Sequence, residues 1–148
     1  MEKKKNNQEF VLELPAENEN FEQVTAFVEE HLEALGCGGK TAMQIQMAVE
    51  EIFVNVASYA YSPDKGDIRI AIWGTSEPDM VWMRFSDRGI PFNPLEKPDP
   101  KISQKAEQRE IGGLGIYLVK KFMDSVSYTY ENQENTLIFG KKYERDTR

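Results

Sequence analysis

The sequence predicts an α+β fold, a two-layer sandwich in which a mixed, mostly antiparallel sheet carries its helices on one face. Five segments alternate apolar and polar residues with the two-residue period of a half-buried strand, and three segments have helical spacing. The alternation leaves one sheet face more polar, so we expect the helices to cover the other face. A doubly wound fold is less favoured, because a single strand–helix–strand crossover is available for a parallel pair.

The N-terminal part is expected to form one strand and two helices. Residues 10–14 alternate in polarity and predict the first strand. Apolar residues at helical spacing over 21–35 predict an amphipathic helix, with Asn20 as its N-cap and Gly36 at its end. Over 40–61 the apolar residues fall nearly all round the helix, so this second helix should be buried on most sides.

The C-terminal part is expected to supply the rest of the sheet and a third helix. Residues 90–111 are rich in Pro, Lys, Asp and Gln with little periodicity, and we interpret them as a lid. A glycine run at 112–115 then opens a helix that ends near Met123. Four strands are predicted, as two hairpins, at residues 68–72, 81–85, 126–130 and 137–139. The second hairpin is expected to turn around residues 132–135.

The length and the net charge of the chain limit the classes of function that we expect. The 148 residues suit one domain, which we place at 8–143, with flexible tails at 1–7 and 144–148. The formal net charge of -7 disfavours nucleic acid and membrane partners, although backbone N–H groups and a metal ion could still hold a nucleotide. A single cysteine, Cys37, and the absence of a signal sequence predict a cytoplasmic protein without a disulfide.

Two polar residues interrupt the buried second helix. Glu51 and Asn55 are four residues apart and therefore share one face of the helix. A buried carboxylate needs a partner, a solvated cavity or a cation, and an Asn carbonyl oxygen is a ligand that Mg²⁺ accepts. The alternative is a polar pair satisfied within the core, with neighbouring Glu50 on an exposed edge.

A hexapeptide at 87–92, Asp-Arg-Gly-Ile-Pro-Phe, follows the third predicted strand. It could be a simple turn, because Asp-x-Gly often closes strands. If Asp87 instead faces a pocket, its acceptor-only carboxylate would select a ligand with an exocyclic amine, such as adenine, over guanine. Gly89 would then let the ligand ring approach the backbone.

The glycine run Gly112-Gly113-Leu114-Gly115-Ile116 precedes the third helix. Glycine-rich backbone at a helix N-terminus offers N–H groups and a favourable dipole to a phosphate. The alternative is a hinge for the lid.

The order of these three motifs resembles the ATP-binding domain shared by gyrase, heat-shock chaperone, sensor histidine kinase and mismatch-repair ATPases. The resemblance spans about 50–143. The small anti-sigma factor serine/threonine kinases are most similar, because the segments at 87–94 and 112–119, followed by Met123-Asp124, look like their two glycine boxes. The resemblance implies the Bergerat ATP-binding fold.

The resemblance also implies roles for the helix pair and the lid. Asn55 would ligate Mg²⁺, and Glu51 would be the general base toward a serine or threonine hydroxyl. Lys101, Lys105 or Arg109 of the lid could approach the γ-phosphate. The lid, from about 93 to 110, would become ordered when ATP binds.

The remaining implied roles concern the nucleotide. Asp87 would bind the adenine amine and Gly89 would line the ring. Gly113 and Gly115 would cradle the phosphates. Thr136, placed before the last strand, would also reach the adenine side.

The function that follows is an ATP-dependent, Mg²⁺-requiring serine/threonine kinase that phosphorylates an anti-sigma-factor antagonist. Its other implied partners are a sigma factor and a second copy of the chain, as a homodimer. A binding switch that uses ATP without catalysis is one alternative. A detached sensor-kinase domain acting on histidine is another, although the Pro-Phe after Gly89 and the short lid argue against it.

His31 lacks the proline usual in phosphoacceptor segments, and Ile52 and Tyr59 depart from the family pattern.

Overall fold

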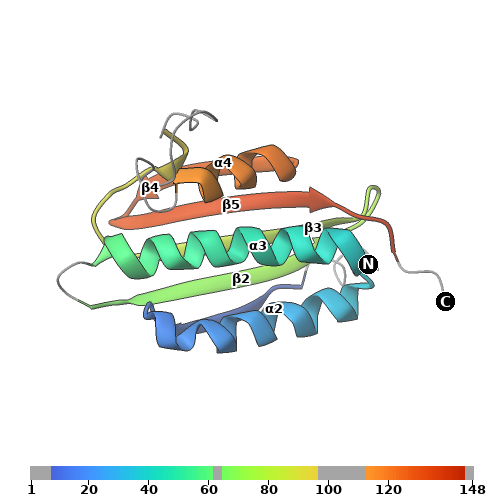
Figure 1. Ribbon diagram of the computed structural model, residues 1–148, viewed down its shortest axis with the longest axis horizontal. Helices are drawn as coiled ribbons and strands as arrows, with labels where there is room; N and C mark the ends of the chain where they lie inside the picture. Colours follow the sequence, from blue (N-terminus) through green and yellow to red (C-terminus); the bar gives the residue numbers. More distant parts are fainter. Residues whose placement is uncertain (1–7, 62–64, 97–112, 146–148) are drawn as a thin grey trace.

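A computed structural model describes residues 8–61, 65–96 and 113–145 of the chain (Figure 1). The strands and longer helices in chain order are β1 (Phe10–Pro15), α2 (Phe21–Leu35), α3 (Gly39–Asn55), β2 (Asp67–Thr75), β3 (Met80–Asp87), α4 (Gly113–Phe122), β4 (Ser125–Glu131) and β5 (Glu134–Lys142). The short helical segments are η1 (Asn18–Asn20), η2 (Val56–Ala60) and η3 (Pro94–Glu96). Lys101, Lys105, Arg109 and most of the expected lid lie outside the described residues.

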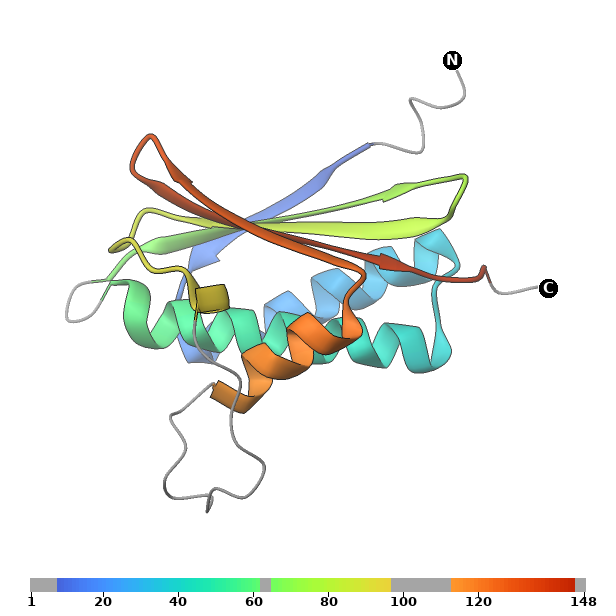
Figure 2. The ribbon, with the colours of Figure 1, turned by 90° about the horizontal axis from the view of Figure 1, so that it is seen from above.

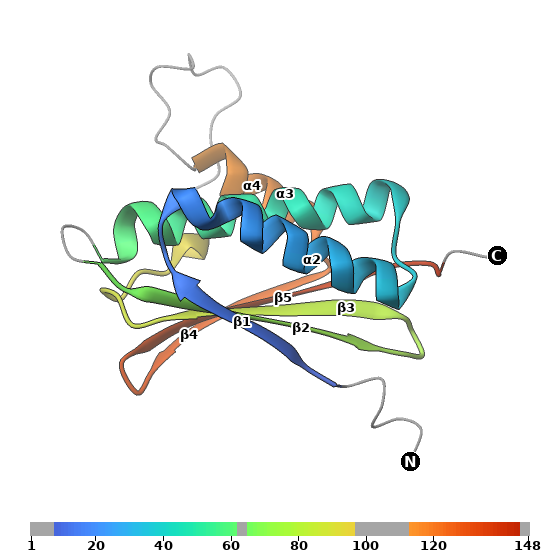
Figure 3. The ribbon, with the colours of Figure 1, turned by 90° about the horizontal axis from the view of Figure 1, so that it is seen from below.

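The five strands form one sheet in the order β1-β2-β3-β5-β4, and each of the four pairings is antiparallel. The three helices form a second layer on one face of this sheet, as the edge-on views show (Figures 2 and 3). The predicted two-layer α+β fold is therefore confirmed, with no parallel pair among the described strands. None of the described helices is long and apolar enough to cross a membrane.

The core lies between the sheet and the helices. Alternate residues of β2, Ile68, Ile70 and Ile72, are fully buried and point toward the helix layer. Buried residues of α3 such as Phe53 meet them from the other side, and α3 runs between α2 and α4 (Figure 1). The expectation that the second helix is buried on most sides was wrong for its N-terminal half, where Met43 is 73% exposed. Composition alone does not reveal this, because α2 and α4 flank α3 without enclosing its outer face.

The helix α2 begins and ends where the sequence predicts. Gly36 adopts the left-handed conformation with φ 78°, and its N–H donates to Glu33 O and Leu32 O. Asn20 is the N-cap residue of α2, as predicted, but its side chain makes no capping hydrogen bond. Its amide instead donates to Pro15 O at 2.9 Å, because the turn η1 leads directly into the helix and ties its start to the end of β1.

The β4–β5 hairpin turns tightly. Asn132 and Gln133 have φ values of 55° and 63°, and positive φ at two successive residues is the conformation of a two-residue hairpin turn. The turn is shorter than the one expected around 132–135. Residues 135 and 136 consequently belong to β5, where they alternate between the two faces of the sheet.

Candidate functional site

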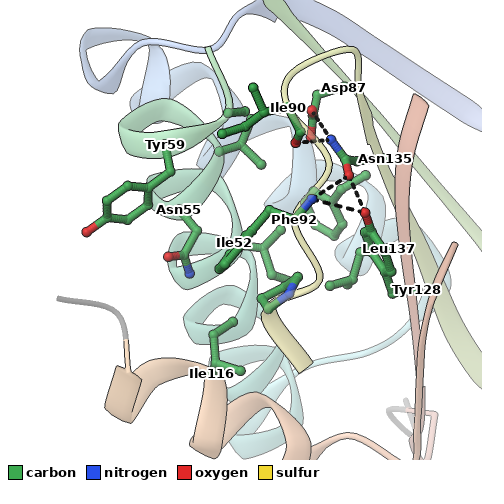
Figure 4. Close-up of a pocket in the computed structure, with 14 residues that line it drawn as sticks. Ile52, Asn55, Tyr59, Asp87, Ile90, Phe92, Ile116, Tyr128, Asn135 and Leu137 are labelled. Atoms are coloured by element: carbon green, nitrogen blue, oxygen red, sulfur yellow. Dashed lines mark hydrogen bonds between the residues drawn. The ribbon is translucent and has the colours of Figure 1, made fainter. Parts of the chain in front are cut away.

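A pocket lies between the C-terminal part of the long helix, formed by α3 and η2, and the ends of β3, β4 and β5 (Figure 4). Its walls are mostly apolar, with a few polar side chains. The lining residues are Ile52, Asn55, Val56, Tyr59, Ala60, Phe85, Asp87, Ile90, Phe92, Pro94, Ile116, Tyr128, Asn135 and Leu137. Apolar walls with a few convergent polar groups are typical of small-molecule sites.

Asp87 is the last residue of β3 and is only 7% exposed. Its Oδ1 accepts hydrogen bonds from the backbone N–H of Gly89 and from the side-chain amide of Asn135, each at 2.9 Å. Within the described part of the chain Oδ2 accepts none, so it is available to a ligand donor. Burial raises the pKa of Asp87, whereas the hydrogen bonds from Asn135 and Gly89 act in the opposite direction.

Residue 89 must be a glycine because the end of the neighbouring helix lies too close for a side chain. A Cβ at this position would lie 2.2 Å from the carbonyl oxygen of Ala60, and the next residue, Ile90, donates its N–H to that same oxygen at 2.8 Å. Gly89 is not among the pocket-lining residues, while Ile90 and Phe92 are. Ile90 and Phe92 therefore line the pocket where Gly89 was expected to, and Gly89 allows the loop to pass close to η2.

The segment η2 continues α3 with the wider π-helical geometry. Short π-helical segments inside a helix occur frequently at functional sites. Here η2 presents Val56, Tyr59 and Ala60 to the pocket. The segment thus forms the wall opposite the sheet.

Asn135, and not Thr136, contributes to the pocket from β5. Asn135 is directly opposite Asp87 in the β3–β5 pairing, and opposed residues have their side chains on the same face. Thr136 pairs with Ser86 and Thr129, so its side chain lies on the other face of the sheet. The expectation that the Thr136 side chain reaches the pocket was therefore wrong, because Thr136 alternates with Asn135 and Leu137, which both line the pocket.

Glu51 and Asn55 interact as their spacing predicts. The side-chain amide of Asn55 donates to Glu51 O at 2.9 Å and to Glu51 Oε2 at 3.1 Å. Asn55 is 7% exposed and lines the pocket, and Glu51 is half-buried one turn away. With its amide nitrogen bonded to Glu51, Asn55 keeps its carbonyl oxygen as an acceptor.

The donor set fits a magnesium ion bound together with phosphates. The described residues contain no cluster of three or more His, Cys, Asp or Glu side chains that could hold a metal by themselves. Mg²⁺ commonly takes one or two oxygens from the protein and the rest from phosphates and water. The carbonyl oxygen of Asn55 is a ligand of that kind.

Gly113 and Gly115 belong to the first turn of α4, and Ile116 in the same turn lines the pocket. The first N–H groups of a helix have no partners within the helix and favour anions. The N-terminus of α4 therefore lies on the side of the pocket where Asn55 is found (Figure 4). Gly112, which precedes it, lies outside the described residues.

Residues 14–141 match the histidine kinase-like ATPase domain family. The chain belongs to this family. The match covers most of the chain and includes every pocket residue named above, and it confirms the resemblance to ATP-binding domains that the three motifs indicated.

The individual relatives have low sequence identity to this chain. A protein of Bacillus cereus named serine-protein kinase RsbW is 29% identical over 106 residues, which cover 69% of this chain and 64% of the relative. A Bacillus mycoides protein of the same name is 28% identical over the same length. The matched part thus spans less than two thirds of these relatives.

One solved structure shares the fold. It contains the RsbU and RsbW domains of Rv1364c from Mycobacterium tuberculosis, with a TM-score of 0.67 and 17% identity. The superposition covers 95% of this chain and 34% of the other.

The sequence singled out Asp87 and Asn55 but not most of the other lining residues, among them Asn135, Tyr128, Ile90 and Phe92. Ile90 and Phe92 lie inside the hexapeptide that the sequence singled out, but their apolar side chains gave no chemical signal. Tyr128 and Asn135 could have been found from strand alternation, because Tyr128 is on the same face as Val126 and Asn135 is on the same face as Leu137 and Phe139.

Proposed function

We propose that the protein binds ATP with Mg²⁺ in this pocket and transfers phosphate to a serine or threonine of an anti-sigma-factor antagonist. Family membership and the serine-protein kinase names of the relatives support this proposal. The observation that carries it is the arrangement of the polar groups. Asp87 lies at one end of an apolar pocket, and Asn55 and the start of α4 lie at the other end (Figure 4).

This arrangement suits a nucleotide lying along the pocket. Oδ2 of Asp87 would accept a hydrogen bond from the exocyclic amine of adenine, between the apolar side chains of Ile52 and Leu137. The keto oxygen of guanine would face the same carboxylate without a donor, so ATP would be preferred to GTP. The phosphates would reach the N–H groups at the start of α4 and the carbonyl oxygen of Asn55.

Phosphate transfer then requires a base near the phosphates. The Glu51 carboxylate would take the proton of the attacking hydroxyl, whose oxygen bonds to the γ-phosphorus as the bond to the β-phosphate oxygen breaks and ADP leaves. A bound Mg²⁺ supplies neutralisation of the phosphate charge. Glu51 is held beside the pocket by its hydrogen bond with Asn55.

Two variants test the kinase proposal against a non-catalytic switch. Glu51→Gln should keep Mg-ATP affinity but reduce phosphate transfer by ~10²-fold or more, because it removes a proton acceptor and preserves shape. Asn55→Ala should weaken Mg-ATP binding itself, because it deletes a metal ligand. The measurements are calorimetric binding and transfer of labelled phosphate to the antagonist.

The outcomes separate the two functions. If the wild-type protein transfers no phosphate, yet ATP changes its affinity for the partner, the protein is a switch. If Glu51→Gln also abolishes ATP binding, Glu51 is structural, and Glu50 is the next candidate for the base.

The proposal also covers the location of the protein in the cell, its regulatory partners and its oligomeric state. A cytoplasmic protein that controls transcription would bind a sigma factor in one state and the antagonist in another, and we propose that it does so as a homodimer. Light scattering on the purified protein tests the homodimer. Co-purification with a candidate sigma factor, with and without ATP, tests the regulatory role.

A further inference from the structure

Asn135 sits at the centre of a hydrogen-bond network at the base end of the pocket (Figure 4). It is 6% exposed and lies in β5 between Asp87 of β3 and Tyr130 of β4 in the strand pairing. Its side chain therefore points to the helix face of the sheet, where Asp87 also points. Neither the motifs nor the proposed catalytic chemistry gives this residue a role.

Every hydrogen-bonding group of the Asn135 carboxamide is used. The nitrogen donates to Asp87 Oδ1 and to Ile90 O, each at 2.9 Å. The oxygen accepts from the Tyr128 hydroxyl and from the N–H of Phe92, the latter at 3.2 Å. One side chain thus joins the Asp87 carboxylate to the loop that passes over the pocket.

The groups on both sides of the carboxamide determine which way it faces. If the amide were turned over, its oxygen would meet the carboxylate of Asp87 and the carbonyl of Ile90, which are acceptors like itself. Its nitrogen would in turn meet the N–H of Phe92. The N–H of Phe92 and the two acceptors, Asp87 and Ile90 O, therefore select the orientation in which the nitrogen faces Asp87, and the Tyr128 hydroxyl supports it by donating to the oxygen.

This orientation decides what Asp87 offers to a ligand. Asp87 lines the pocket, its Oδ1 receives two donors, from Asn135 and Gly89, and its Oδ2 accepts no hydrogen bond from the described residues. A carboxylate stabilised on one oxygen is an acceptor on the other. Without Asn135 the buried carboxyl would hold a proton more readily, and a protonated carboxyl can donate to a keto oxygen.

We propose that Asn135, oriented by Tyr128, is a specificity-determining residue that holds Asp87 as an acceptor and so makes the pocket select 6-aminopurine over 6-ketopurine nucleotides. The inference rests on the proposed nucleotide binding. It adds that selectivity depends on a positioning residue in β5 and on the tyrosine behind it. Asp87 alone is not sufficient.

The test compares Mg-ADP and Mg-GDP affinities by calorimetry, so that it does not depend on phosphate transfer. Asn135→Leu, which keeps the approximate volume, should weaken Mg-ADP binding about tenfold or more and bring the ratio of the two affinities close to one. Tyr128→Phe removes one hydroxyl and should weaken Mg-ADP binding roughly two- to fivefold in the same direction. Thr129→Val, on the other face of β4, is the matched control and should leave both affinities unchanged.

A double variant separates positioning from general loss of structure. If Tyr128 acts through Asn135, Tyr128→Phe has no further effect on the affinity ratio in an Asn135→Leu background. Equal losses for Mg-ADP and Mg-GDP in either single variant would overturn the inference, because they would indicate a structural role alone. Tyr128→Phe provides this answer even if Asn135→Leu does not fold. If the wild-type protein binds neither nucleotide, the proposed function itself fails.

Discussion

The role of Asp87 can be tested by replacing one oxygen of its carboxylate with an NH₂ group, which is the change in Asp87→Asn. In an Asp87→Asn variant the side-chain oxygen would take the place of Oδ1, because the N–H of Gly89 and the amide of Asn135 both donate there at 2.9 Å. The new NH₂ group would then stand where Oδ2 was, facing the pocket. The pocket would present a donor where the wild-type protein presents an acceptor.

The size of the effect follows from the burial of this group. Asp87 is 7% exposed, so water cannot replace the hydrogen bond that its carboxylate would make with the adenine amine. Losing one buried, charge-assisted hydrogen bond costs about 2 kcal/mol, which corresponds to roughly thirtyfold in the dissociation constant. GTP binding should lose nothing, because its keto oxygen gains a donor.

Calorimetry with Mg-ATP and Mg-GTP measures both effects. The wild-type protein should prefer ATP by more than about tenfold, and Asp87→Asn should reduce or reverse that preference. Equal affinities of the wild-type protein for the two nucleotides would refute the reasoning. So would normal ATP binding by Asp87→Asn, since the carboxylate would then have no part in base recognition.

Three further predictions concern the same region. Burial raises the pKa of Asp87 above 3.8, so the folded protein binds more protons than the unfolded chain. The stability that this group contributes is greatest below pH 3.8 and is lost as pH rises through the raised value. Denaturant titrations measure the free energy of unfolding of the wild-type protein and of Asp87→Asn. The difference between the two, wild type minus variant, should therefore decrease as the pH rises. Gly89→Ala should lower the free energy of unfolding by about 1–3 kcal/mol in the same assay, because its Cβ would meet Ala60 O at 2.2 Å. Thr136→Val should keep the calorimetric ATP affinity within about twofold, since Thr136 is on the sheet face opposite the pocket.

Elements with strong periodicity were predictable from the sequence. The three isoleucines of β2 alternate without interruption, and the spacing of Val24, Val28 and Leu32 defines the buried face of α2. The Glu51–Asn55 pair was also predictable, because helical geometry alone brings residues four apart together. In each case a local rule was sufficient.

Features that depend on contacts between distant segments could not be predicted. Nothing in the sequence distinguishes the π-helical turn η2 from the rest of the helix, and the need for Gly89 arises from Ala60, twenty-nine residues earlier. Asn135 illustrates a different limit. Residue 135 was expected in the turn and not in the strand, so its side chain was not assigned to the helix face, whereas Thr136 alternates to the opposite face.

The hydrogen bond between Ile90 N–H and Ala60 O has a consequence for the whole site. It attaches the loop that carries the groups proposed for base recognition to the end of the helix that carries Glu51 and Asn55. Asn55 and Ala60 are five residues apart on that helix, a rise of roughly 6–8 Å along its axis. The two ends of the pocket are therefore spaced by a single helical unit. A nucleotide that contacts both Asp87 and Asn55 must match that spacing. The length of this helical segment therefore sets the distance between the groups proposed for base recognition and those proposed for phosphate transfer.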